Sequence, residues 1–228
     1  MCNRTSSILP ALEKMQPGDH YCGIFRSDAD QRRITVDFVR LGLERHEQML
    51  YLVHLQTAER LRATLLEADI DVDALIASGQ LVVQAAKDVY LVDGVFDPRK
   101  MIEILGQETT RAVEAGYTAL RVTGEMSWAL EGDPGTERLV EYEALLNEFY
   151  ATGAPTYSIC QYDQRRFDAE LLLDVLHTHP RVLLDTEGID NSSMYYVPPQ
   201  AFLAVDRNGG ILETRLANLT GSAAASPA

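Results

Sequence analysis

This 228-residue sequence is short of positive charge. It has 20 lysines and arginines against 34 aspartates and glutamates, for a formal net charge of −14 and an isoelectric point near 4.7. Because proteins bind nucleic acid by displacing the cations that surround its phosphates, this balance argues against direct binding to DNA or RNA. An anionic membrane surface would repel the chain for the same reason.

Long apolar runs and paired cysteines are also missing. No segment approaches the roughly 18 apolar residues of a membrane span, and the first twenty residues hold no apolar run of secretory length. The three cysteines, Cys2, Cys22 and Cys160, form no CxxC motif and have no metal-ligand spacing. We therefore expect a cytoplasmic protein whose thiols are small core residues in a reducing compartment.

Glycine is absent from the loop where a phosphate site would lie. The segment FRSDADQRRITVDF follows the first expected strand and contains no GK[ST], and Asp28 and Asp30 would repel phosphate. The sequence also has no GxSxG elbow and no HExxH. Accordingly, no catalytic residues, metal or cofactor are assigned. Glu125 and Asp163 could serve as an acid/base pair, which leaves an enzyme, including a degenerate ATPase, as the weakest alternative.

Apolar residues are present at the ordinary globular level of 46%, in two alternating hydrophobic periods. Strands are expected over 21–25, 49–54, 81–84, 118–123, 156–161, 181–184 and 193–197. Helices are expected to begin at the capping residues Ser27, Thr57, Asp97, Thr136 and Asp168. This alternation predicts an α/β fold, a mostly parallel sheet flanked by helices on both faces.

The sequence contains no internal repeat and no long linker, which favours a single domain over residues 16–203. The hydrophobic pattern fades after about Leu203, where Gly209, Gly210 and the run TGSAAASPA are typical of a flexible end. We therefore expect a flexible tail over 204–228. The first fifteen or so residues are also expected to be loosely held.

In parallel α/β sheets, ligands usually bind outside the carboxyl ends of the strands. Two expected strand ends place Arg26 and His54 there. A third end is followed by GEMSWAL, which combines Glu125 and Met126 with Trp128, the only tryptophan. Trp and Met would offer an adaptable apolar surface and Glu125 a polar group. The structural alternative is that Met126 and Trp128 pack as a core lid while Glu125 caps the turn.

A fourth strand end carries CQYD, in which Gln161, Tyr162 and Asp163 can all form hydrogen bonds with a ligand. Asp163 could instead cap the next helix or pair with a neighbouring arginine. Our leading hypothesis is that a small organic molecule binds between GEMSW and CQYD, and that Trp128 and Tyr162 close over it.

The histidines carry no clear metal pattern. His177 and His179 lie where a helix is expected to end before Pro180, which favours helix capping over metal binding. His20 and Cys22 would point to the same side of a strand, but the sequence indicates no third ligand.

Several segments together resemble the MEDS family, the methanogen/methylotroph sensory domain, over about residues 18–184. They are GDHYCGIF, LGLERHEQMLYLV, SGQLVV, the FDP helix start, GYTALRVTGEMSWAL, CQYDQRRF and LHTHPRVLL, of which RVTGEMSW and CQYD are the most specific. The resemblance implies a RecA/KaiC-like α/β core with a degenerate phosphate loop, and a role in sensing small hydrocarbon derivatives. The positions that match the family pattern are His20, Arg121, Glu125, Met126, Trp128, Gln161, Tyr162, Asp163 and His179.

We therefore expect a non-catalytic, small-molecule sensing module of a bacterial or archaeal signalling or transcription-regulation system. The expected ligand-binding residues are Arg26, His54, Arg121, Glu125, Met126, Trp128, Gln161, Tyr162 and Asp163. No helix-turn-helix or kinase segment is visible, so the output would be a signalling partner protein, a change of homo-oligomer, or a module outside this sequence. The alternatives are a nucleotide-binding KaiC-like relic and a pure interaction module that controls a kinase or sigma-factor regulator.

Overall fold

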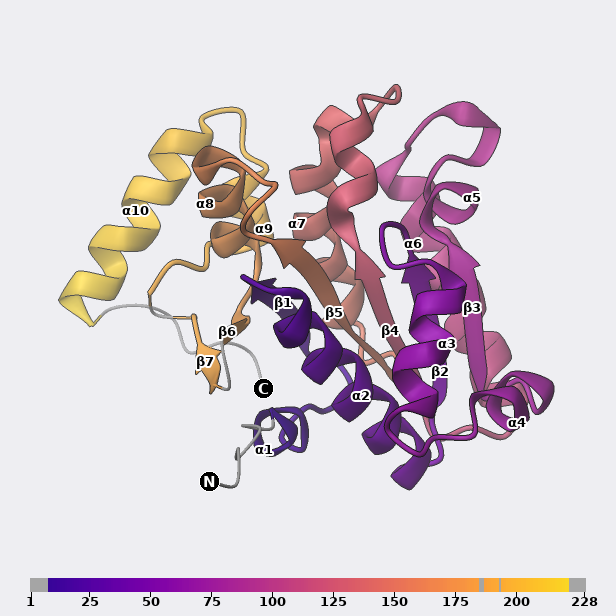
Figure 1. Cartoon of the computed structure of the whole chain (residues 1–228). Coiled ribbons are helices and arrows are strands. Elements are labelled where there is room, and N and C mark those ends of the chain that lie inside the picture. The colour runs from indigo at the N-terminus through magenta and orange to yellow at the C-terminus, as the bar shows by residue number, and fades with distance from the viewer. Residues whose placement is uncertain (1–7, 185–186, 193, 222–228) are drawn as a thin grey trace.

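The computed structural model describes residues 8–184, 187–192 and 194–221, and a seven-stranded sheet runs through its centre (Figure 1). The strands lie in the order β3-β2-β4-β5-β1-β6-β7. All neighbours pair parallel except β6 and β7, which pair antiparallel. The strands are β1 (His20–Phe25), β2 (Gln48–Val53), β3 (Leu81–Ala85), β4 (Leu120–Glu125), β5 (Thr156–Asp163), β6 (Arg181–Leu184) and β7 (Glu187–Asp190).

Helices connect the strands. The α-helices are α1 (Leu9–Leu12), α2 (Asp28–Glu44), α3 (Ala58–Leu66), α4 (Val72–Ala77), α5 (Ala86–Tyr90), α6 (Pro98–Glu114), α7 (Leu139–Tyr150), α8 (Ala169–Thr178), α9 (Pro199–Phe202) and α10 (Arg207–Thr220). The 3-10 helices are η1 (Val92–Gly94), η2 (Met126–Glu131) and η3 (Thr136–Arg138). Within the described ranges, none of the helices combines the length and apolar character that crossing a membrane requires.

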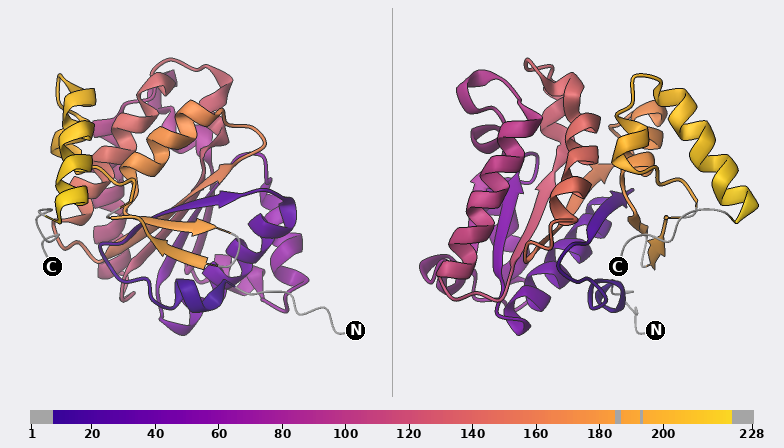
Figure 2. Two further views of the ribbon diagram at one scale, coloured as in Figure 1. Left: turned by 90° about the vertical axis from the view of Figure 1, so that its left-hand side faces the viewer. Right: turned by 180° about the vertical axis from the view of Figure 1, so that it is seen from behind.

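The sheet separates two hydrophobic cores. Helices α1 to α4 pack on one face and α5 to α8 on the other, as the front and rear views in Figures 1 and 2 show. Strand side chains alternate between the two cores: Tyr51 of β2 belongs to the first, whereas Leu50 and Leu52 belong to the second. This arrangement confirms the predicted α/β class, with a mostly parallel sheet covered on both faces.

The predicted helix starts are confirmed where a side chain caps the helix. Ser27, Thr57, Asp97 and Asp168 each accept a hydrogen bond from a backbone N–H in the first turn of α2, α3, α6 and α8. Thr136 instead begins the short η3 and provides no side-chain cap. The single turns α4 and α5, which the sequence analysis did not predict, flank β3.

The prediction of a strand over 193–197 is wrong for residues 194–197, which the structure describes. Residues 194–196 donate their backbone N–H groups to the Asn191 carbonyl in a tight turn, so these groups are not available to a strand ladder. The last strand is β7 instead, which reverses direction along β6. The expectation of a loose start also fails from Ile8 onward, because Ile8, Leu12 and Met15 are buried in the first core.

Helix α10 replaces most of the expected flexible tail. The Asp206 carboxylate accepts the N–H of Gly209 and caps the helix, and Arg207 pairs with Asp174 of α8. Gly210 allows close packing, because a Cβ there would lie 2.3 Å from the Ala201 carbonyl oxygen. The Gly-Gly pair therefore serves helix packing, and flexibility stays a prediction for 222–228, which lie outside the described residues.

Gly135 allows a test of the close contact between Phe96 and the loop that follows η2. It has φ +90°, and a Cβ would lie 2.2 Å from the Phe96 backbone oxygen, whereas Gly132, with φ +77°, has open space around it. We expect Gly132→Ala to lower the free energy of unfolding by about 1–2 kcal/mol through backbone strain alone. Gly135→Ala should cost about 1–3 kcal/mol more because Phe96 must move. Denaturant unfolding of both variants would measure this, and equal costs would contradict the close contact.

Candidate functional site

A cleft of about 280 Å³ lies at the carboxyl ends of β1, β2, β4 and β5, where ligands bind in parallel α/β folds. Its wall is largely polar. The lining residues are Phe25, Asp28, Gln31, Leu55, Gln56, Arg60, Glu125, Ser127, Gln161, Asp163, Arg165 and Arg166. The cleft is therefore suited to a small molecule that carries hydrogen-bonding groups.

The cleft floor is a buried hydrogen-bond network centred on Gln161. The Gln161 amide nitrogen donates to the Thr123 hydroxyl at 2.8 Å and to the Tyr51 hydroxyl at 3.0 Å. Its amide oxygen accepts from Gln31 of α2 at 3.2 Å. Burial, together with the charge of Glu125, raises the pKa of Tyr51, so its hydroxyl remains a neutral hydrogen-bonding group. The network orients the Gln161 and Gln31 amides at the cleft.

Glu125 holds the loop between β2 and α3. Its carboxylate accepts the backbone N–H groups of His54, Leu55 and Gln56 at 3.1–3.4 Å. Burial raises the pKa of Glu125, and these N–H groups oppose part of that shift. The carboxylate thus gives the cleft wall its shape, in agreement with the turn-capping alternative for this residue.

Arg165 bridges two acidic residues at the cleft. Its guanidinium contacts Asp163 and Asp28, each at 2.7 Å. Burial favours a higher pKa for Asp163, but the hydrogen bonds from Arg165 outweigh it and lower the pKa. Asp163 therefore pairs with its neighbouring arginine, as the structural alternative supposed.

The loop between β1 and α2 is unsuited to cradle phosphate. It comprises Arg26 and Ser27 alone, without glycine. At the start of α2, the Ser27 hydroxyl accepts the N–H of Asp30, and the Asp30 carboxylate accepts the N–H of Arg26. The N–H groups of Arg26 and Asp30 are thus already used. The carboxylates of Asp28 and Asp30 add negative charge where phosphate would bind.

The structure brings three of the predicted residues, Glu125, Gln161 and Asp163, together in the cleft. Arg26 and His54 lie at the same end of the sheet but outside the lining. The Arg26 side chain donates to Gln164, and the His54 ring contacts Ser127 and Glu131 of η2.

Met126, Trp128 and Tyr162 are separated from the cleft, because all three are fully buried in the second core. Trp128 stacks on Tyr90 with ring centroids 4.4 Å apart. Tyr162 follows Gln161 on β5, so the two-residue repeat of a strand sends it to the opposite face. The hypothesis that Trp128 and Tyr162 close over a ligand in this cleft is therefore wrong, and the core-lid alternative describes Met126 and Trp128 better.

Arg121 lies near the amino end of β4, far along the strand from the cleft. It is fully buried, its Nε donates to Glu47 at 2.7 Å, and its guanidinium also contacts the Tyr157 hydroxyl and lies over the Phe38 ring. The structure assigns it to the core rather than to the cleft.

Sequence reasoning missed several lining residues. Gln31 and Arg60 come from the first turns of α2 and α3, which the strand-end rule does not sample. Gln56 and Ser127 lie within segments that the rule did select, but no motif distinguished them. A search of the first helical turn after each strand would have found Gln31 and Arg60.

Other hollows fit the predicted ligand less well. Two larger ones, of about 720 and 510 Å³, lie among α7 to α10 and beside the β6–β7 edge, away from the parallel strand ends and from all nine predicted residues. An apolar cavity of about 20 Å³ between the sheet and α6 and α7 has room for about one water molecule. The cleft at the strand ends is therefore the candidate site.

Comparisons with known proteins identify the family and the fold. Residues 19–180 match the sequence profile of MEDS, described as the methanogen/methylotroph, DcmR sensory domain. The transcriptional repressor DcmR of Methylorubrum extorquens is 29% identical over 161 residues, which make up 71% of this chain and 58% of that protein. The chain thus spans less than two thirds of the length of this curated relative.

Solved structures show the same fold at low sequence identity. An uncharacterized protein from Pyrococcus horikoshii, in complex with an unknown peptide, has a TM-score of 0.58 at 14% identity, covering 75% of this chain and 78% of its own. The flagellar accessory protein FlaH from Methanocaldococcus jannaschii has a TM-score of 0.51 at 11% identity and covers 76% of each chain. A KaiC-like protein from Pyrococcus horikoshii scores 0.50 at 12% identity, covering 73% and 70%. These likenesses confirm the KaiC-like fold that the sequence resemblance implied.

The placement of Arg121 predicts a structural defect on substitution. Arg121→Met should lower the free energy of unfolding by about 3–5 kcal/mol, because it leaves Glu47 buried without its cation. Arg138→Met, which breaks a half-exposed pair with Glu141, should cost less than about 1 kcal/mol. Urea unfolding of the two variants checks this, and similar costs would argue against a buried pair.

The hydrogen bonds that Glu125 accepts predict a loss of stability when its carboxylate is replaced by an amide. Glu125→Gln should cost about 1–3 kcal/mol in unfolding free energy, because an amide cannot accept all the N–H groups that the carboxylate holds. Amide hydrogen exchange should also quicken at Leu55 and Gln56. Glu103→Gln, at an exposed position on α6, is the control and should leave this exchange unchanged. Unchanged exchange in Glu125→Gln would disprove the proposed hold on the loop.

Proposed function

Because the chain belongs to the MEDS family of methanogen/methylotroph, DcmR sensory domains, we propose that it is the small-molecule sensing module of a bacterial or archaeal regulatory system. The observation that carries this proposal is the polar cleft at the strand ends, which Glu125, Gln161 and Asp163 line. No catalytic role is needed for these residues, because Glu125 and Asp163 are engaged by backbone N–H groups and by Arg165.

The cleft favours a small hydrocarbon derivative with a hydroxyl, carboxyl or amide group. Its volume of about 280 Å³ is at the lower end of ligand pockets, which favours a small ligand. The Gln31 and Gln161 amides offer both donors and acceptors, while the positive charges of Arg60 and Arg165 lie beside the carboxylates of Asp28 and Asp163. The side chain of Leu55 and the ring of Phe25 provide apolar contact.

Binding would be read out through the loops that surround the cleft. The Glu125 carboxylate holds residues 54–56, and His54 connects this loop to η2 through Ser127 and Glu131. A ligand that competes for the Gln31–Gln161 hydrogen bond would bias the positions of α2 and of this loop together. Signal output is thus a shift between two loop arrangements.

The proposed recipient of the signal is a partner protein or a module outside this sequence. The related DcmR is named a transcriptional repressor, and this chain covers 58% of it. The net charge of −14 disfavours binding of this chain itself to DNA. We therefore place DNA binding elsewhere in the regulatory system.

A nucleotide is the second candidate ligand, since the fold is KaiC-like. Two features argue against it: the carboxylates of Asp28 and Asp30 lie at the start of α2, and the N–H groups of Arg26 and Asp30 already donate to Asp30 and Ser27. These features disfavour a triphosphate more than they disfavour a small organic molecule.

A ligand screen tests the proposal. The purified chain is heated with small alcohols, carboxylic acids, amides and halogenated hydrocarbons, and with ATP with or without Mg²⁺, while emission from Trp128 is followed. An organic ligand at 100 times its dissociation constant should add about 2.7 kcal/mol of stability. Trp128 is buried in the second core and does not line the cleft, so its emission serves to follow unfolding.

Two matched variants locate the binding. Gln31→Ala should weaken the affinity for the organic ligand about tenfold, equivalent to one lost hydrogen bond of about 1.4 kcal/mol. Gln107→Ala, an exposed position on α6, should leave it unchanged. Stabilisation by ATP alone would favour a nucleotide-binding relic, and silence across the panel would favour an interaction module that controls a kinase or sigma-factor regulator.

A further inference from the structure

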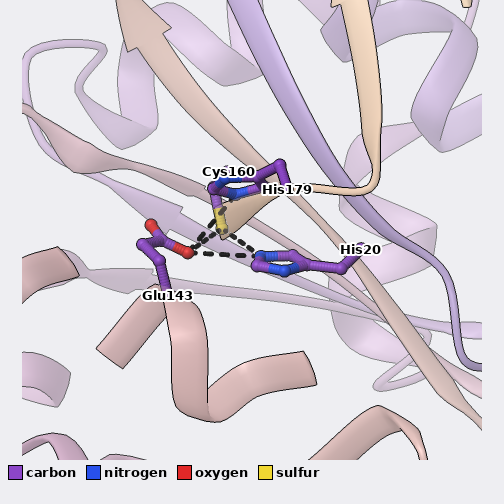
Figure 3. A group of neighbouring side chains, drawn as sticks. All are labelled: His20, Glu143, Cys160 and His179. Carbon is purple, nitrogen blue, oxygen red and sulfur yellow. Dashed lines mark hydrogen bonds and ion pairs between the residues drawn. The ribbon is translucent and has the colours of Figure 1, made fainter. Parts of the chain in front are cut away.

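Four buried side chains converge on one point in the second core, on the opposite face of β5 from the cleft floor. They are His20 at the start of β1, Glu143 of α7, Cys160 of β5 and His179 directly after α8 (Figure 3). His20, Glu143 and His179 are fully inaccessible, and Cys160 is almost so. The sequence did not reveal this cluster, because its members come from four separate elements.

Four of the six separations between the donor atoms match those of a tetrahedral metal site. Glu143 Oε2 lies 3.2 Å from His20 Nε2 and 3.4 Å from His179 Nε2. Cys160 Sγ lies 3.3 Å from Glu143 Oε2 and 3.5 Å from His20 Nε2. Metal–nitrogen and metal–oxygen bonds of about 2.0–2.2 Å and a metal–sulfur bond of about 2.3 Å place tetrahedral donors roughly 3.3–3.6 Å apart. All four atoms lie within 4.8 Å of one another.

The hydrogen bonds around the two imidazoles leave both Nε2 atoms available as ligands. His179 Nδ1 lies 2.7 Å from the Val175 carbonyl oxygen, which can only accept, so Nδ1 carries the proton. His20 Nδ1 lies 3.1 Å from Asn147 Oδ1, and the amide nitrogen of Asn147 donates to the Thr178 carbonyl, which orients the amide. In the neutral tautomer, each Nε2 then presents a lone pair to the Glu143 carboxylate.

Lone pairs that face a carboxylate repel it unless a proton or a metal ion lies between them. His179 Nε2 in fact makes no hydrogen bond with any described residue, although it is fully buried. Such an unpaired buried nitrogen is costly without a partner. Protonating both rings would instead place two positive charges side by side, because the ring centroids are 4.0 Å apart.

We infer that His20, Glu143, Cys160 and His179 form a binding site for a divalent transition-metal ion, with Zn²⁺ as the ion that fits best. Two imidazoles, a thiolate and a carboxylate are ligands that Zn²⁺ takes in tetrahedral sites. One thiolate and one carboxylate balance the charge of a dication, so the buried site would be neutral overall. The Cys160 thiol, which donates to Glu143 at 3.3 Å, gives up its proton when the metal binds.

The surrounding residues complete the site. Asn147 and the Val175 carbonyl orient the two imidazoles, and the Tyr162 hydroxyl lies 2.5 Å from the second oxygen of Glu143. Four protein ligands and full burial are typical of a structural metal site. Such an ion would connect β1, α7, β5 and the end of α8.

The test uses Co²⁺ as the probe, because tetrahedral Co²⁺ bound to thiolate has visible bands and a charge-transfer band. The full chain is unfolded in denaturant with a chelator, freed of the chelator while still unfolded, and refolded with Co²⁺, since a buried site is best loaded during folding. We expect one Co²⁺ per chain, both sets of bands, and their loss on adding one equivalent of Zn²⁺. Wild-type chain that refolds without the charge-transfer band would overturn the proposal, whatever the variants do.

Cys160→Ala and Cys22→Ala form a matched pair. Both cysteines are buried, and they are register partners on adjacent strands, but only Cys160 belongs to the cluster. Cys160→Ala should lose the charge-transfer band and weaken Zn²⁺ binding by more than the 10–100-fold that a lost second-shell partner costs. Cys22→Ala should keep both. A band that persists in Cys160→Ala, or disappears in Cys22→Ala, would contradict this ligand set.

Discussion

Strand β5 has helices against both of its faces, and all eight of its side chains are buried. In such a strand, each successive side chain must enter a different core. Gln161 and Asp163 therefore point to the side of α2 and α3, while Cys160 and Tyr162 point to the side of α7 and α8. This alternation separates CQYD into two environments, a polar cleft that opens to solvent and a closed cluster around Glu143.

Polar groups in both environments are costly to bury unless they are paired. On the cleft side, amides and hydroxyls pair with one another through Gln161, Tyr51 and Thr123, so the cleft floor needs no ion. On the other side, Glu143 receives contacts from Tyr162, Cys160 and two imidazoles, yet His179 Nε2 has no hydrogen-bond partner among the described residues. The two faces of one strand thus support different chemistry, exchangeable hydrogen bonds on one and metal ligation on the other.

The two sites are mechanically close, because they share β5 and the elements beside it. Glu125 pairs in register with Gln161, and Cys22 with Cys160, so a shift of β5 relative to β4 or β1 would be felt on both faces. A rigid connection among β1, α7 and α8 would leave the loops at the strand ends as the parts most free to respond to a ligand. The same sheet can therefore carry mobile loops that sense a ligand at the cleft and a rigid core behind them.

The sequence by itself determined the α/β class, most strand positions, the helix starts at Ser27, Thr57, Asp97 and Asp168, and the family. These depend on local periodicity and capping, which neighbouring residues specify. It also placed Glu125, Gln161 and Asp163 at the strand ends. Only the tertiary structure decided that Trp128 and Tyr162 face the core, that Arg121 pairs with Glu47, and that His20 and His179 meet. Those contacts join residues far apart in the chain, and the strand order that creates them is not encoded in any local pattern.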